Sequence, residues 1–336
     1  MSTARLPHNR LITIEADEPN AKVSPMLGQR CSNGPVVDLS RGHPVIGEVQ
    51  MTTATRNAGS RPEPPLGDGV LVDRGWLAAH LNDADLRVVE VDVSRAAYDN
   101  WHIEGAVLWN VYTDLKDTSY RTVGAAAMEQ LVARSGIGPD STVVFYGYAP
   151  ALGLWLMKFY GHANVRILDC SRDTWRAGGH PWSTAGSEPP ARGYRIGGED
   201  PRLRADRAAV RDAIHQPGTT LVDVRSSAEY QGDCFWPSGG MEPGGRTGHV
   251  PSAVHQPIDG LYNPDGSFRS AAEMRSLFSP AVFDGGHELI TYCTIGGRAA
   301  TAWFVLTHLL GRDPVRVYDG SWAEWGRSTD TAVERP

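Results

Sequence analysis

The sequence predicts an α/β protein made of two tandem copies of one domain, each a parallel sheet flanked by helices. Three observations carry this prediction. Short apolar runs alternate with segments of helical periodicity from about residue 70 onward. Several blocks of sequence recur in the same order in both halves of that region, which is typical of a duplicated domain. The length of 336 residues also fits about two domains.

The first 68 residues differ from the rest of the chain. No aromatic residue precedes Trp76, although the chain has 10 Trp, 11 Tyr and 7 Phe, and the segment ends in the Pro- and Gly-rich stretch SRPEPPLGDG. A segment of this composition cannot bury enough apolar surface to offset the entropy of ordering it. We therefore expect residues 1–68 to form a disordered tail.

The clearest repeat pairs VRILDCSRDTW (Val165–Trp175) with VRVYDGSWAEW (Val315–Trp325) without a gap. Upstream, VVEVDVS mirrors LVDVRS, HIEGA mirrors HVPSA, and TVVFYG mirrors ELITYC. These blocks predict an N-terminal domain over residues 69–185 and a C-terminal domain over residues 195–330. The linker between them is STAGSEPPARGY, which begins at Ser183.

The elements of the second copy can be read in order. TTLVDV is a buried strand by its β-branched run, SAVHQPI a second short strand, AAEMRSLF a helix and ELITYC a central strand. AATAWFVLTHLLG is a helix that ends at Gly311, and VRVYDG is a last strand. The first copy follows the same order. Ligands of such sheets bind at the carboxyl ends of the strands.

Charge and composition exclude several classes of protein. A formal net charge of −7 and a pI near 5.9 argue against a nucleic-acid partner. No apolar run reaches about 18 residues, and no signal peptide is visible, so we expect no membrane contact. The four cysteines (Cys31, Cys170, Cys234 and Cys293) lie far apart, which disfavours a zinc site or a disulfide framework. We expect a cytoplasmic protein without a metal.

The central strand of the second copy ends at Cys293, and a helix begins near Arg298. Gly296 and Gly297 allow the loop between Cys293 and Arg298 to curl. We therefore expect the N–H groups of this loop to surround the sulfur. The positive end of the following helix acts at the same place. Both effects favour a thiolate or a persulfide anion. A buried structural cysteine is the alternative, but the strand–Cys–Gly-Gly–Arg–helix context favours a functional one.

The duplicated domain, the GHVPSA turn, the six-residue loop Cys293–Arg298 and the YDGSWAEW ending resemble a tandem-domain rhodanese, a sulfurtransferase. The resemblance covers roughly Val70 to Arg327. It implies that the C-terminal copy is catalytic and needs no cofactor. Cys293 would take sulfur from thiosulfate or 3-mercaptopyruvate and pass it to cyanide, a thiol or a protein acceptor. The N-terminal copy would be inactive, because Gly147 stands where the strand alignment puts the cysteine.

The resemblance also implies residues that bind the small anionic donor. Arg225 occupies the position of an arginine that holds the donor's anionic group, with a salt bridge to a carboxylate such as Glu229 as the alternative. Arg298 closes the loop, where it either binds the anion or caps the fold. Arg246 lies just before the GHVPSA turn and could reach the cleft. The remaining candidates are the loop residues Thr294, Ile295, Gly296 and Gly297.

The length of the loop separates this chain from phosphatases of the same fold. They use C-x5-R to hold phosphate, whereas Cys293 and Arg298 are separated by four residues. Thr294 and Ile295 replace the cationic residues typical of thiosulfate loops, and Ile295 cannot act as the serine of mercaptopyruvate loops. The loop is closer to an actinobacterial thiosulfate type, so thiosulfate is the expected donor.

A persulfide carrier or redox-sensing protein that serves a partner protein is the second hypothesis. It draws on the insertion Gln231–Thr247, which is rich in Gly and Pro and contains Cys234. That cysteine is either a second thiol for sulfur relay or a shielded loop residue.

Overall fold

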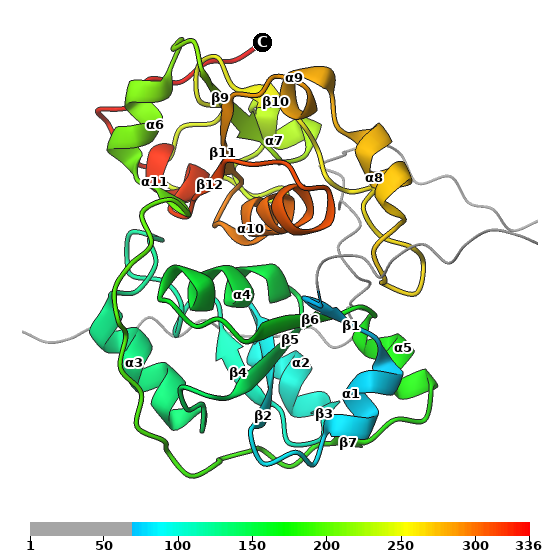
Figure 1. The fold of residues 1–336 in the computed structure, drawn as a ribbon. Coiled ribbons are helices and arrows are strands. Elements are labelled where there is room, and N and C mark those ends of the chain that lie inside the picture. Colours follow the sequence, from blue (N-terminus) through cyan, green and yellow to red (C-terminus); the bar gives the residue numbers. More distant parts are fainter. Residues whose placement is uncertain (1–68) are drawn as a thin grey trace, which may run out of the picture.

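The computed structural model describes residues 69–336, which form two α/β domains stacked on one another (Figure 1). The tail expected over residues 1–68, with Cys31, lies outside the described residues. Each domain contains a five-stranded parallel sheet, with the strand orders β1-β6-β5-β2-β4 and β10-β9-β11-β12-β8. The second order, written in reverse, is β8-β12-β11-β9-β10. Each of its strands then takes the same place in the chain of its domain as its counterpart in the first order. The predicted fold class of two copies of one domain is therefore confirmed.

The N-terminal domain begins its sheet with β1, which pairs with β6, and adds a small antiparallel pair, β3 with β7. β7 takes up Ser183, the first residue of the expected linker. Its elements are β1 (Leu71–Val72), α1 (Arg74–His80), β2 (Leu86–Asp92), α2 (Arg95–Asn100), β3 (His102–Ile103), β4 (Val107–Asn110), α3 (Ala125–Arg134), β5 (Thr142–Gly147), α4 (Pro150–Phe159), β6 (Val165–Leu168), α5 (Arg172–Ala177) and β7 (Trp182–Ser183).

The C-terminal domain contains every strand and helix expected from its sequence. Its elements are β8 (Arg204–Ala205), α6 (Arg207–Ala213), β9 (Thr219–Asp223), α7 (Ser227–Gln231), β10 (Val254–His255), α8 (Ala271–Leu277), α9 (Pro280–Phe283), β11 (Glu288–Tyr292), α10 (Gly297–Phe304), η1 (Val305–Leu309), β12 (Val315–Tyr318) and α11 (Ser321–Trp325). β11 lies at the centre of the sheet, between β9 and β12.

The long helix after β11 differs from its prediction in one respect. The α-helix ends at Phe304, and the chain continues as the π-helical segment η1. There the N–H of Leu310 donates to the carbonyl of Val305 at 3.0 Å, five residues back. Gly311 follows with a φ of 66°, the left-handed conformation expected of a residue that stops a helix.

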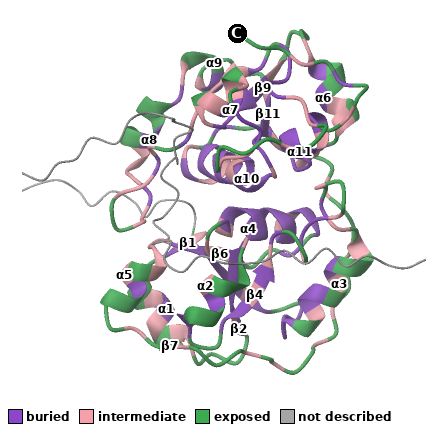
Figure 2. Ribbon diagram, turned by 180° about the vertical axis from the view of Figure 1, so that it is seen from behind, coloured by how far each residue is buried: buried purple, intermediate pink, exposed green. Residues whose placement is uncertain are grey.

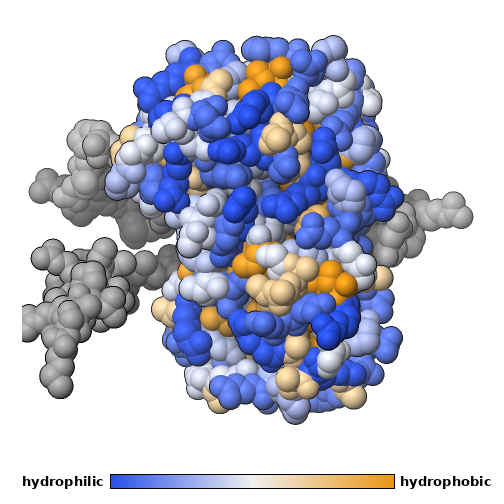
Figure 3. All heavy atoms as spheres, turned by 90° about the vertical axis from the view of Figure 1, so that its left-hand side faces the viewer, coloured by the Kyte–Doolittle hydropathy of each residue, from blue (hydrophilic) through white to orange (hydrophobic). Residues whose placement is uncertain are grey.

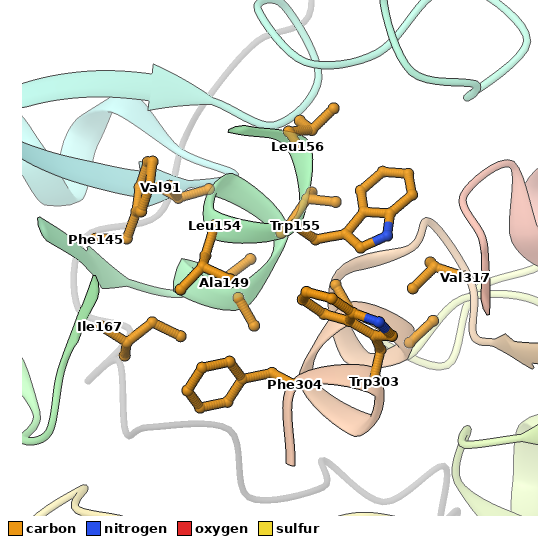
Figure 4. Close-up of a cluster of buried hydrophobic side chains, with 14 of the residues drawn as sticks. Val91, Phe145, Ala149, Leu154, Trp155, Leu156, Ile167, Trp303, Phe304 and Val317 are labelled. Carbon is orange, nitrogen blue, oxygen red and sulfur yellow. The ribbon is translucent and has the colours of Figure 1, made fainter. Parts of the chain in front are cut away.

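The two domains share one hydrophobic core. α4 packs on α10, and both helices are largely buried (Figure 2). The apolar cluster that joins them includes Trp155 of α4 and Trp303 of α10, neither more than 1% exposed (Figure 4). At the start of α10, Gly297 lies against Ala149, just before α4. The position of each domain is thus fixed by apolar burial against the other.

The outer surface contrasts with this interior. The face seen in Figure 3 is mainly hydrophilic, with apolar residues in small groups. Within residues 69–336, no helix combines the length and the hydropathy needed to cross a bilayer.

Candidate active site

Cys293 lies directly after the central strand β11, and only 1% of its surface is exposed. Its Sγ accepts a hydrogen bond from the backbone N–H of Gly296, with 3.1 Å between nitrogen and sulfur. Gly296 has a φ of 95°, a conformation that turns the chain back toward the cysteine and that residues with a Cβ avoid. α10 begins at the next residue, and the first N–H groups of a helix have no acceptor within it. Of the loop N–H groups expected around the sulfur, that of Gly296 is in contact with it.

The DGSW motif braces this loop from the neighbouring strand β12. Ser321 Oγ accepts a hydrogen bond from the backbone N–H of Cys293 at 3.1 Å. The N–H groups of Trp322 and Ala323 donate to the carbonyl oxygens of Cys293 and Thr294, both at 2.9 Å. The start of α11 therefore fixes the first two residues of the loop, which explains why the motif accompanies the cysteine loop.

Glu229 of α7 belongs to the site. The sequence suggested it only as an alternative partner of Arg225. It pairs instead with Arg298, through contacts of 2.8 and 2.7 Å, and its Oε1 accepts a hydrogen bond from the Thr294 hydroxyl at 2.5 Å. Burial alone would raise the pKa of Glu229, but Arg298 and Thr294 lower it to about 2. Arg298 closes the loop through this carboxylate.

Arg225 lies in the interior and has no exposed surface. Its guanidinium forms an ion pair with Asp223, with 2.6 Å between Nη2 and Oδ2, and donates to the carbonyl of Gly248 at 2.7 Å. It also lies 4.5 Å from the centre of the Trp322 ring. The alternative of a salt bridge to a carboxylate is therefore realised, with Asp223 in place of Glu229. A role in donor binding stays a prediction.

The structure places Arg246 beside the C-terminal segment. Its Nη1 donates to the carbonyl of Thr331 at 2.6 Å, and its Nη2 bonds the carbonyl of Ser328. Among the other candidates, Ile295 is half-buried against the core, whereas Gly297 is fully buried. Thus Gly296 is the candidate that bonds the Cys293 sulfur, and Thr294 and Arg298 of the same loop bind Glu229. Arg225 and Arg246 bind protein groups outside the loop.

The N-terminal copy has no equivalent loop. Only Tyr148 and Ala149 separate β5 from α4, whereas four residues separate β11 from α10. Gly147 has a φ of 104°, and a Cβ at this position would lie 2.9 Å from the carbonyl oxygen of Val91. A side chain at position 147 therefore strains the backbone and meets the adjacent strand.

The N-terminal domain nevertheless contributes to the surroundings of Cys293. Burial raises the pKa values of Tyr112 and Tyr148, and the charge of Cys293 adds to both shifts. The insertion Gln231–Thr247 also reaches this domain, because the Trp236 ring lies 5.8 Å from that of Tyr120. Within residues 69–336, no group of three His, Cys, Asp or Glu side chains is arranged to hold a metal ion.

Cys234 and Phe235, in the same insertion, are buried completely. Phe235 belongs to a hydrophobic cluster of the C-terminal domain.

Comparison with known proteins places this site in a family. The family model of the rhodanese-like domain matches residues 73–178 and 206–328. A Haloferax volcanii protein named "Putative thiosulfate sulfurtransferase" is 38% identical over 276 residues, which cover 79% of this chain and 96% of that protein. A Mycolicibacterium smegmatis protein of the same name is 39% identical over 272 residues, with coverages of 79% and 97%.

Two further matches have other names. "Sulfur carrier protein TtuD" of Thermus thermophilus is 38% identical over 276 residues, which cover 79% of this chain and 96% of that protein. The crystal structure of YnjE superposes with a TM-score of 0.68 at 25% identity, covering 79% of this chain and 68% of that one. The resemblance inferred from the repeats and the cysteine loop is thereby confirmed. The chain belongs to the rhodanese family and carries two rhodanese-like domains in tandem.

Proposed function

We propose that this protein is a sulfurtransferase that carries sulfane sulfur as a persulfide on Cys293, from thiosulfate or 3-mercaptopyruvate to cyanide, a thiol or a protein acceptor. The observation that carries the proposal is the hydrogen bond from the Gly296 N–H to the Cys293 sulfur at the carboxyl end of the central strand. A donor aimed at sulfur stabilises it as an anion, which is its nucleophilic form. The sulfurtransferase names of two relatives support the same reaction class.

The chemistry divides one difficult transfer into two steps. The Cys293 thiolate attacks the outer sulfur of thiosulfate, a new S–S bond forms, and the original S–S bond breaks with sulfite as the leaving group. In the second step cyanide attacks the outer sulfur of the persulfide. Thiocyanate then leaves, and the Cys293 thiolate returns. Neither step needs an outside oxidant or reductant, since each displaced group takes the electron pair of the broken bond.

For the donor anion we propose the amides of the loop and Arg298, because they belong to the loop that begins at Cys293. A guanidinium suits a sulfonate or a carboxylate. Arg298 would share its guanidinium between Glu229 and the donor, whereas Arg225 and Arg246 hold protein partners outside the loop. Thiosulfate remains the first donor to test, and a cytoplasmic location stays a prediction from the cysteine pattern.

The test measures steady-state release of sulfite from thiosulfate with cyanide present, and pyruvate from 3-mercaptopyruvate in parallel. The wild-type protein should turn over at least one donor, and Cys293→Ser should abolish turnover. Cys170→Ser is the matched control, because burial raises the pKa of the Cys170 thiol to about 12 and keeps it protonated. Loss of activity in the control, or its retention in Cys293→Ser, would contradict the proposal.

A persulfide carrier that serves a partner protein is the second candidate. It is favoured by the name of the Thermus thermophilus relative and by Thr294 and Ile295, which replace the cationic residues typical of thiosulfate loops. Persulfide formation from a donor without turnover of cyanide or small thiols would favour the carrier. Hydrolysis of a phosphate ester at Cys293 would contradict both candidates.

A further inference from the structure

Lys116 is a buried cation at the boundary between the domains. It lies between β4 and α3 of the N-terminal domain and is only 5% exposed. Its Nζ donates a hydrogen bond of 2.8 Å to the backbone carbonyl of Asp319, in the C-terminal domain. A carbonyl oxygen satisfies one of the three ammonium protons but does not balance the charge.

Burial would raise the pKa of the Asp319 carboxylate, but the charges of Lys116 and Arg204 lower it, so this carboxylate is shared between the two cations. Its Oδ1 accepts a hydrogen bond from Arg204 Nε at 2.8 Å, and its Oδ2 accepts one from the Thr122 N–H at 2.6 Å. Within residues 69–336, no carboxylate is in ion-pair contact with Lys116. The counter-charge of this buried ammonium is therefore shared with Arg204, and a further anion nearby would stabilise it.

A second anion beside Lys116 is the sulfur of Cys293. A Cβ built on Gly296 would lie 3.1 Å from Lys116 Nζ, so the ammonium lies beside the residue whose N–H donates to that sulfur. Burial lowers the pKa of Lys116, and the negative charges of Asp319 and Cys293 oppose this effect.

The other charges that face this pair are already matched. Arg204 is paired with Asp319, and Arg298 with Glu229. The Asp117 carboxylate, on the same segment as Lys116, acts on the ammonium less than Asp319 and Cys293 do. Within residues 69–336, Lys116 thus has no carboxylate in ion-pair contact, and it shares the charge of Asp319 with Arg204.

We propose that Lys116 is the counter-charge of the Cys293 sulfur, so that the N-terminal domain completes the active site of the C-terminal domain. Its ammonium stabilises the thiolate before sulfur transfer and the persulfide anion after it. The second of these roles rests on the proposed function, whereas the first does not.

The experiment follows alkylation of Cys293 by iodoacetamide between pH 5 and 10, with the modified peptide identified by mass spectrometry. In Lys116→Met the midpoint of the pH profile should move upward by about one pH unit, since a neighbouring opposite charge favours the charged form of a thiol. The alkylation rate below the midpoint should fall about tenfold. This measurement needs no sulfur transfer, so it stays informative even if the proposed function is wrong.

Thr122→Val is the matched control. It removes the hydroxyl bond to the same aspartate across the same domain contact, without removing a charge. Its midpoint should equal that of the wild type, with thermal unfolding checked for both variants. An unchanged midpoint in Lys116→Met would overturn the proposal, and so would an equal shift in Thr122→Val. Lys116→Gln gives the same comparison if the Met variant does not fold.

Discussion

The Glu229 carboxylate and the Arg298 guanidinium face each other through two hydrogen bonds, of 2.8 and 2.7 Å, at the edge of the Cys293 loop. Glu229 also completes a capping box with Ser226 at the start of α7. The Glu229 carboxylate thus caps the start of α7, accepts a hydrogen bond from Thr294 and pairs with Arg298, the last residue of the loop. The conformation of the loop and the stability of the domain depend on the same ionised group.

Glu229→Gln should destabilise the protein in a pH-dependent way. The folded pKa of about 2 lies below the ordinary glutamate pKa of 4.5, so ionised Glu229 stabilises the fold fully above about pH 4.5. That contribution, on the order of 3 kcal/mol, disappears as the pH falls toward 2. Urea unfolding at several pH values should show a large difference between variant and wild type at pH 7 and a small one near pH 2.

The second capping box of the chain supplies the control for that experiment. Glu273 makes the same bonds to Ser270 at the start of α8, but it is exposed and does not contact the loop. Glu273→Gln should have a small effect that depends little on pH. Equal losses in both variants would mean that capping, and not the pair with Arg298, accounts for the stability.

Gly296→Ala should abolish sulfur transfer, because a Cβ there would lie 2.8 Å from the carbonyl oxygen of Asp319 and the φ of 95° is left-handed. A left-handed conformation costs a residue with a Cβ about 1–2 kcal/mol. Gly297→Ala is the neighbouring control, since its Cβ would meet only Ala149 at 3.4 Å, an ordinary contact. Persulfide formation in a single turnover should be lost in the first variant and kept in the second.

The N-terminal copy should not become active when it receives a cysteine. In Gly147→Cys, Cys293→Ser the new side chain would meet the carbonyl of Val91, and only two residues precede α4. We expect no release of sulfite from thiosulfate above the level of Cys293→Ser alone. Measurable transfer by the double variant would show that the N-terminal copy is more than a scaffold.

Arg225→Met should lower stability rather than donor affinity. It removes one partner of a fully buried ion pair and leaves Asp223 without its counter-charge, which costs about 3–5 kcal/mol. Denaturant unfolding and the KM for thiosulfate separate the two roles. A rise in KM of tenfold or more at unchanged stability would instead support the donor-binding role suggested by the sequence.

Local patterns were sufficient to predict the fold class and the cysteine loop. The repeats identify the duplicated domain, and the residues from Cys293 to Arg298 carry their geometry in consecutive positions. The partners of the site are different, because they come from distant parts of the chain. Glu229 lies 69 residues from Arg298, and Lys116 lies 203 residues from Asp319. No periodicity reports such contacts, since only the packed domains bring the residues together.

The partners of the arginines could not be predicted from the sequence either. A resemblance gives Arg225 a position in the family but not its rotamer, its burial or its partner. Only the folded structure shows that the Arg225 guanidinium forms an ion pair with Asp223, two residues earlier. The chain has only three lysines, namely Lys22, Lys116 and Lys158. This rarity was the one sequence feature that set Lys116 apart from the many arginines.

The packing of α4 on α10 also explains why the N-terminal domain is retained in this chain. A deletion that removed the copy without a nucleophile would leave Trp303 and its apolar neighbours in water. Such an exposed apolar patch favours aggregation of the shortened product. The burial of α4 against α10 therefore makes the N-terminal copy hard to lose, even though it carries Gly147 where the catalytic copy has its cysteine.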